Sequence, residues 1–310
     1  MKMLKALLAG ALAFSLAACA QDKEQEKVVL EPIKVLAPLG APSVSLLGLA
    51  DDENVTVETV DGANVLSAEL TKEDSEYDVI IAPINLGAGM ISKGKSSYVL
   101  DSVVTWGNLY VVGTDESALT SEGTFAAFGE KAVPQKILTA SLDLSTITPS
   151  VTYFASVNEV QQQLMSKKAN VGLMAEPAAT ATIKKAKEKG IELTILKDLQ
   201  KEYQAKNNTK TAGYPQAALF VKDGSQEKAK PYIEKAATFA NETAKADSEA
   251  LTKAIETITP AKLGIPNAQI VVKTWDRQNI HFVKALDAKD DITTFLNQFK
   301  LKLEDSAYNK

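Results

Sequence analysis

The alternation of short apolar runs with helix-like segments constrains the fold of this chain more than any other feature of its sequence. The run YDVIIAP at 77–83 is continuously apolar, as is typical of a strand that a parallel sheet buries on both faces. The run NVTVETV at 54–60 alternates apolar with polar residues, which indicates a half-exposed strand, and residues 63–70 between the two runs have a helical pattern. Strands that alternate with helices predict an α/β architecture with parallel sheets.

The same alternation continues to about residue 221 and then gives way to a mostly helical tail. We expect strands at 31–38, 54–60, 77–83, 109–112, 124–128, 151–155, 171–175, 192–196 and 217–221, with a short one at 279–283. We expect helices at 63–70, from 86, from 134, at 157–168, up to 189, at 226–258 and at 287–302.

A single cysteine lies at the end of an apolar N-terminal run. Lys2 and Lys5 precede residues 6–16, which are apolar but too few to span a bilayer. The residues LAAC at 16–19 resemble the bacterial lipobox, whose cysteine takes a diacylglyceryl group; the alternative is that Cys19 is an ordinary small apolar residue. We predict a lipoprotein signal peptide at 1–18, a lipidated Cys19, a polar tether at 19–27 and a body on the outer face of the cell membrane.

The composition argues against several classes of function. A net charge of −5 speaks against a nucleic-acid partner. His281 is the only histidine and Cys19 the only cysteine, so we expect no metal, no cofactor and no Ser–His or Cys–His catalysis. Arg277 is the only arginine, which argues against a ligand site built on arginine clamps. His281 falls in the short strand expected at 279–283, where we expect a structural role.

Four loops that follow expected strands are candidates for ligand contact. In α/β sheets, ligands bind beyond the carboxyl ends of strands, although plain turn and helix-cap chemistry explains each loop equally well. Gly40 allows a close backbone approach, Ser43 and Asn85 are suited to cap the helices that follow, and the turn TWGN at 105–108 joins an aromatic ring to an amide. The candidate residues are Leu39, Gly40, Ala41, Ser43, Asn85, Thr105, Trp106, Gly107, Asn108, Phe128 and Glu130.

Glu176 closes the expected strand VGLMA at 171–175 and places a carboxylate at its end. A buried carboxylate needs a partner. That partner is either a cationic or amide group of a ligand, or a lysine or a helix N-terminus of the protein itself.

The stretch GAGMIS at 87–92 looks like a dinucleotide-binding fingerprint but departs from it. Its third glycine is replaced by Ser92, and Ile84, Asn85 and Leu86 separate Gly87 from Pro83, which closes the strand. We therefore do not expect a nucleotide cofactor here.

The order of these segments resembles the solute-binding proteins of ABC importers in the nitrate, taurine/sulfonate and thiamine-precursor group. The segments that carry the resemblance are YDVIIAPINLGAGMISKG, VVTWGNLYVVG, SVNEVQQQLMSKKANVGLMAEPAAT and PQAALFV. It implies the two-lobed type II periplasmic-binding-protein fold, each lobe a mostly parallel sheet flanked by helices. Lobe one would be 28–112 plus 217–310 and lobe two 113–216, with crossover segments near 108–113 and 214–217.

The resemblance also implies a function. The chain would capture a small molecule in the cleft between its lobes by hinge closure and deliver it to an ABC permease, as a monomer. The family's cleft residues would fall on the four loops and on Glu176. The aromatic residues that could stack on a ligand are Trp106, Tyr110, Phe128, Tyr153 and Tyr214.

Two other readings of the sequence stay open. One is an enzyme of the same fold that uses Glu176 or Glu130 as acid or base, and the other is a surface adhesin or sensor lipoprotein. For the receptor, we expect a neutral or cationic, partly aromatic ligand, because arginines are scarce; the alternative is an oxyanion held by helix N-termini.

Overall fold

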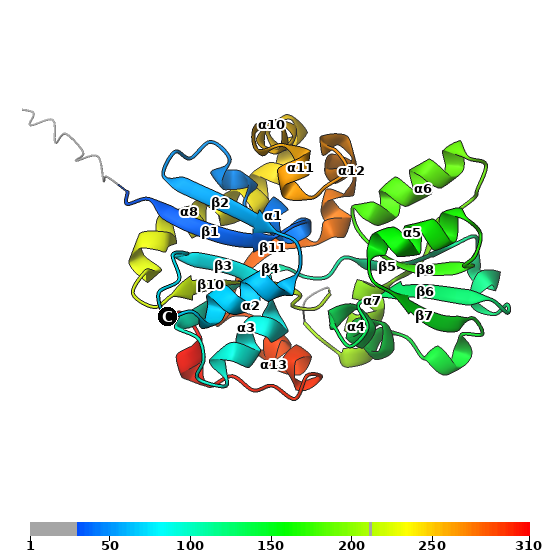
Figure 1. Ribbon diagram of the computed structural model, residues 1–310, viewed down its shortest axis with the longest axis horizontal. Coiled ribbons are helices and arrows are strands. Elements are labelled where there is room, and N and C mark those ends of the chain that lie inside the picture. The colour runs from blue at the N-terminus through cyan, green and yellow to red at the C-terminus, as the bar shows by residue number, and fades with distance from the viewer. Residues whose placement is uncertain (1–29, 211–212) are drawn as a thin grey trace, which may run out of the picture. The chain divides into compact units, whose positions relative to one another are not determined.

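Two separate β-sheets organise the residues that the computed structural model describes, which are 30–210 and 213–310. The six-stranded sheet has the order β11-β4-β10-β3-β1-β2 and the five-stranded sheet has the order β7-β6-β8-β5-β9 (Figure 1). The predicted signal peptide, Cys19 and tether lie outside the described residues.

The six-stranded sheet begins with the strands that the sequence marks most clearly. β1 (Ile33–Pro38) pairs in parallel with β2 (Val55–Val60) and β3 (Val79–Pro83). β4 (Tyr98–Thr105) and β11 (Ile280–Lys284) pair antiparallel, as does β10 (Ala217–Lys222) with both β3 and β4. The continuously apolar β3 lies inside the sheet and the alternating β2 lies at its edge, as their patterns predict.

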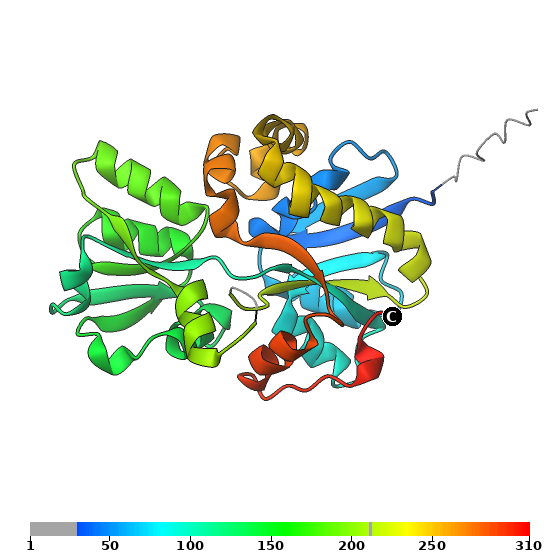
Figure 2. The same cartoon turned by 180° about the vertical axis from the view of Figure 1, so that it is seen from behind.

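Helices cover both faces of this sheet. α2 (Ala63–Thr71) and α3 (Ile84–Ile91) pack on one face (Figure 1), and α8 (Gln226–Thr238) packs on the other (Figure 2). The remaining helices near this sheet are α1 (Ala41–Val44), α9 (Ala244–Ala246), α10 (Ser248–Ile258), α11 (Pro260–Leu263), α12 (Ala268–Gln278) and α13 (Lys289–Asn297).

The five-stranded sheet is built in the same way. β6 (Thr124–Phe128) pairs in parallel with β7 (Ser150–Phe154) and β8 (Val171–Ala175), whereas β5 (Leu109–Gly113) pairs antiparallel with β8 and with β9 (Thr194–Asp198). Its helices are α4 (Val133–Ser141), α5 (Val157–Met165), α6 (Ala178–Glu188) and α7 (Leu199–Asn207).

The two faces of β6 show how alternation builds two apolar layers. Phe125 and Ala127 join the core that contains Ile137 of α4, whereas Ala126 between them joins the core that contains Val160 of α5. Successive strand residues point to opposite faces, so one short apolar strand serves both layers.

Several elements differ from the sequence-based expectation. Both sheets are mixed rather than mostly parallel, because β10 and β5 run against their neighbours. The expected strand at 192–196 is observed two residues later, as β9. β4 was not predicted, although it is central to the first sheet.

The C-terminal helices are shorter than expected. The single helix expected at 226–258 is interrupted before α10, where the backbone of Asp247 is extended. The Asp247 side chain caps α10 by accepting hydrogen bonds from the backbone N–H groups of Glu249 and Ala250. α13 ends at Asn297 rather than at Lys302, and the nearby Lys300 adopts a left-handed conformation with φ of 56°.

The sequence predicted that lobe one ends at residue 112, near the end of the strand β5. The structure places the change from one sheet to the other before β5. β5 pairs with β8 and β9, so residues 109–113 belong to the five-stranded sheet and the chain crosses between sheets at 106–108. It returns between α7 and β10, in the segment that includes Tyr214 and Gln216. We therefore propose lobe limits of 31–105 plus 217–310 and 109–207.

Candidate functional site

The two segments where the chain crosses between the sheets lie against each other. The backbone N–H of Tyr214 donates to the carbonyl of Trp106 at 3.1 Å, and that of Gln216 donates to the carbonyl of Thr105 at 2.9 Å. The Thr105 hydroxyl accepts a further hydrogen bond from the N–H of Ala217 at 3.1 Å. Thr105, a predicted site residue, thus serves to join the crossing segments.

The start of α3 is attached to the same place. The backbone N–H of Ile84, the first residue of α3, donates to the carbonyl of Gln216 at 3.0 Å. Pro83 occupies the N-cap position, so Asn85 does not cap the helix as expected but lies in its first turn. The Asn85 side chain is therefore not engaged in capping.

Four buried side-chain oxygens at these crossings have no hydrogen-bond partner in the described part of the chain. They are Oδ1 of Asn85, Oδ1 of Asn108, the hydroxyl of Tyr214 and Oε1 of Gln216, which we call the crossing cluster. Asn108 and Tyr214 are themselves almost fully buried, at 5% and 0% exposure. Each buried polar group without a partner costs about 1–3 kcal/mol, so a group of four is a candidate for contact with a ligand.

The orientation of the Asn108 amide is fixed by its own hydrogen bond. Its Nδ2 donates to the backbone carbonyl of Glu176 at 2.8 Å, and the backbone N–H of Glu176 donates to the carbonyl of Asn108 at 2.9 Å. Because the amide nitrogen is engaged, the unpartnered atom is an acceptor.

Gly107 allows Tyr214 to approach the first crossing segment. Its φ of 90° lies in the left-handed region, and a Cβ there would meet Cζ of Tyr214 at 2.5 Å. The Tyr214 ring also stacks on Phe295 at 5.9 Å between centroids. Burial raises the pKa of Tyr214 well above its usual value, so its hydroxyl stays protonated and can donate.

Trp106 does not have the exposed position that stacking on a ligand requires. Its side chain has 0% exposure, its ring stacks on His281 at 5.4 Å, and its Nε1 donates to the carbonyl of His281 at 3.2 Å. In this structure Trp106 and His281 are packing partners. Burial also lowers the pKa of His281 to about 4, so the imidazole is neutral at pH 7.

The carboxylate of Glu176 has its partners within the protein. The Oε1 atom of Glu176 accepts from Nε of Arg277 on α12 at 2.8 Å and from the Thr180 hydroxyl at 2.7 Å. Its Oε2 atom accepts from the backbone N–H of Thr180, at the start of α6, at 3.1 Å. A helix N-terminus is thus one of the partners, as the sequence allows, and Arg277 is a further partner that the sequence did not indicate. The only arginine is thus committed to an ion pair with a buried carboxylate.

The short loop after β1 and the helix α1 that follows it hold four of the predicted residues. Gly40 has a φ of 92° and is the N-cap of α1, so the expectation that Ser43 caps this helix is wrong. The Ser43 hydroxyl instead donates to the carbonyls of Gly40 and Leu263, at 2.9 and 3.0 Å. Ala41 is buried, whereas Leu39 is 36% exposed.

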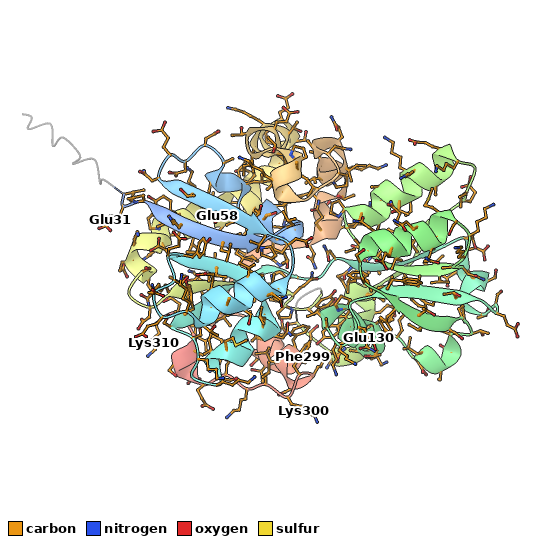
Figure 3. The ribbon with its side chains drawn as sticks, in the orientation of Figure 1. Glu31, Glu58, Glu130, Phe299, Lys300 and Lys310 are labelled. Carbon is orange, nitrogen blue, oxygen red and sulfur yellow. The ribbon has the colours of Figure 1, made fainter. Side chains whose placement is uncertain are left out.

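The turn after β6 carries the last two predicted residues. Phe128 is half-buried and packs against the cores on both faces of the sheet, whereas Glu130 is exposed (Figure 3). Within the described part of the chain, neither residue is hydrogen-bonded to the oxygens of the crossing cluster.

Two residues of the site were missed by the sequence analysis. Gln216 directly precedes an expected strand, so its place at a crossing was the available signal, whereas nothing local marks Arg277 as the partner of Glu176. The stretch GAGMIS has a packing role, because a Cβ on Gly87 would meet Cζ of Phe220 at 2.1 Å. Within residues 30–210 and 213–310 there is no cluster of metal-ligating side chains and no helix able to cross a membrane.

Comparison with known proteins gives matches among solved structures. No protein-family model and no curated protein matches the chain. An ABC transporter protein from Parabacteroides distasonis is 21% identical with a TM-score of 0.73, over 89% of this chain and 94% of that chain. The periplasmic aliphatic sulphonate binding protein SsuA from Escherichia coli is 13% identical with a TM-score of 0.62, over 87% of each chain.

The periplasmic nitrate-binding protein NrtA from Synechocystis PCC 6803 is 11% identical with a TM-score of 0.56, over 90% of this chain and 84% of that chain. At these identities the likeness establishes the fold. The chain has the two-lobed fold of periplasmic binding proteins, and the predicted fold class is confirmed.

Proposed function

We propose that this chain is an extracytoplasmic solute-binding protein that captures a small molecule and delivers it to an ABC permease. The observation that carries the proposal is the crossing cluster, whose unpartnered oxygens lie where the chain passes from one sheet to the other. Buried polar groups are paired in most proteins, and a bound solute would supply the missing partners.

Hinge closure is the proposed mechanism. Asn85 follows β3 of the six-stranded sheet, whereas Asn108 directly precedes β5 of the five-stranded sheet. A solute that contacts both residues binds the closed arrangement better than an open one, and therefore shifts the population toward closure. The permease would recognise the closed form of a monomer.

The chemistry of the crossing cluster favours a neutral or cationic ligand. The Oδ1 of Asn108 is an acceptor, and the oxygens of Asn85 and Gln216 likewise accept hydrogen bonds. Such groups are suited to N–H and O–H donors, whereas an oxyanion needs donors around it. Because the rings of Trp106, Tyr110 and Tyr214 are buried, Phe128 and Tyr153 are the aromatic residues left to stack on an aromatic ligand.

The arrangement of Glu176 disfavours the enzymatic alternative. Its carboxylate accepts hydrogen bonds from Arg277 and Thr180, so this group is engaged rather than available for proton transfer.

Thermal unfolding across a panel of solutes tests the proposal. The panel contains vitamin precursors, pyrimidines, purines, amino acids, sulfonates and nitrate. A ligand at about a hundred times its dissociation constant adds roughly 2.7 kcal/mol and raises the midpoint by several degrees. We expect a shift with a donor-bearing solute that disappears in Asn108→Ala and Gln216→Ala but persists in the control Asn158→Ala, whose side chain is exposed on α5.

The outcomes of this experiment test the proposed class of ligand and the proposed receptor function separately. A shift produced only by sulfonate or nitrate would keep the receptor and refute the preference for a neutral or cationic ligand. A solute that is chemically converted would instead establish the enzyme.

We also propose that Cys19 carries the lipid anchor. Two acyl chains hold a protein stably at a membrane, whereas the polar tether at 19–27 has no affinity of its own for a membrane. In cells that produce the chain, we expect the protein in the membrane fraction, and Cys19→Ala should move it to the soluble fraction. A variant that stays with the membrane would contradict lipidation at Cys19.

A further inference from the structure

A groove lies between α6 and α12, which contact each other although they belong to different lobes (Figure 1). Lys184 and Lys187 line it from α6, and Lys273 and Arg277 line it from α12. Residues three or four apart share one face of a helix, so each helix directs two cations toward the groove.

The charges of the three lysines in this groove are not balanced by acidic residues of its lining. None of the residues that line it is an aspartate or glutamate. Arg277 is paired with Glu176, but Lys184, Lys187 and Lys273 have no ion pair or side-chain hydrogen bond with the described residues. A chain with a net charge of −5 thus carries a locally positive groove, where like charges on two helices repel each other.

We propose that this groove binds a polyvalent oxyanion of the phosphate class that contacts α6 and α12 at once. Such an anion relieves the repulsion between the lysines of the two helices, and its several oxygens accept from more than one ammonium group. Exposed ammonium groups are the usual partners of phosphate, whereas the three unpartnered amide oxygens of the crossing cluster are suited to donors. The groove is therefore a second site, distinct from the proposed solute site.

An anion in this groove would affect the opening and closing of the lobes, because α6 and α12 belong to different lobes. An anion bound to both helices holds α6 and α12 together beside the ion pair of Arg277 and Glu176. It should stabilise the arrangement in which these helices touch, whatever solute occupies the crossing cluster.

Calorimetric titration of the purified full chain with inorganic pyrophosphate tests the proposal. The ionic strength is kept constant with sodium chloride so that general screening does not change. We expect saturable binding at one site. Each lysine that donates to the anion should contribute, so the double variant Lys187→Gln/Lys273→Gln should bind at least about tenfold more weakly.

The matched control is Lys136→Gln, which removes an exposed lysine from α4, outside the groove. It should bind pyrophosphate as the unchanged chain does. Equal weakening in the control and in the double variant, or no saturable heat at all, would overturn the proposal. The lysines of the groove are exposed, so unchanged thermal midpoints should verify that the variants are folded.

Discussion

Gly107 lets the two crossing segments lie against each other because it has no Cβ. Its left-handed φ already favours glycine, and the ring of Tyr214 fills the space that a side chain would need. A single residue at the crossing therefore sets how close Tyr214 can come to the backbone before Asn108.

We expect Gly107→Ala to destabilise the protein by about 2–4 kcal/mol, because backbone strain and a collision with Tyr214 add together. Gly224→Ala is the matched control, since Gly224 has a φ of 87° and open space around it, so only the strain of about 1–2 kcal/mol applies. Denaturant unfolding measures both. Equal losses in the two variants would show that Tyr214 yields to the added methyl group.

The buried His281 predicts a pH dependence of stability. Its pKa falls from 6.5 to about 4 in the folded chain, mainly through burial and also through the charge of Lys245. The unfolded state therefore binds the proton first as the pH falls. The full contribution of the neutral imidazole is present above pH 6.5 and is lost between pH 6.5 and 4, by about 3 kcal/mol.

Comparison with His281→Gln isolates this effect from the titration of carboxylates. Denaturant unfolding from pH 8 to pH 4 should show a steeper loss in the unchanged chain than in the variant. Parallel curves would mean that His281 titrates equally in the folded and unfolded states.

At the scale of elements, the contact between α6 and α12 depends on one buried carboxylate. Glu176 has a fully buried side chain, whereas its partner Arg277 is 39% exposed. Loss of the arginine leaves a buried charge with only the donors of Thr180, and that is more costly than loss of an exposed pair.

We expect Arg277→Met to cost about 2–3 kcal/mol of stability, and Glu176→Gln added to it should recover part of the loss. The control Lys302→Met breaks the exposed pair with Glu304 and should change stability by no more than about 0.5 kcal/mol. Thermal and denaturant unfolding measure all three. A double variant less stable than Arg277→Met would contradict the assignment of Glu176 as the unpaired charge.

At the scale of the whole molecule, a solute-binding protein should change the distance between its lobes. The two mixed sheets are joined through short crossings at 106–108 and before β10, which are suited to act as hinges.

Distances between fluorescent labels test closure in a chain whose Cys19 is replaced by serine. Val65→Cys on α2 and Lys136→Cys on α4 place one exposed label on each lobe. We expect the solute found in the thermal panel to shorten their separation by energy transfer. Labels at Val65→Cys and Leu286→Cys lie on one lobe and should keep their distance; a change in this pair alone would refute rigid-body closure.

The sequence predicts the elements that depend on neighbouring residues better than those that depend on contacts between remote segments of the chain. β1, β2, β3 and β6 were predicted because apolar runs and alternation are local patterns. β4 was missed, although its residues Tyr98–Thr105 are nearly all buried, because the run YVLDSVVT contains Asp101. That aspartate is buried against Lys284 and Asn309, which are remote in the sequence.

The residues of the candidate site also differ in whether local sequence or distant partners decide their role. Asn85 and Asn108 were predicted from turns at the ends of strands, and Tyr214 as an aromatic residue that could stack on a ligand. Each of the three has a buried side-chain oxygen without a hydrogen-bond partner in the described part of the chain, as has Gln216, which was not predicted. Trp106 and Glu176 were expected to contact a ligand, but the partners that occupy them, His281 and Arg277, come from distant segments of the chain.

The sequence by itself determined the order and type of most elements, because helical and strand periodicities arise from neighbouring residues. Only the tertiary structure decided the antiparallel placement of β10 and β5, since strand direction depends on which edge a returning chain meets. It also decided which polar atoms are left unpartnered at the crossings. A missing partner is a property of the whole folded neighbourhood, and no local pattern encodes it.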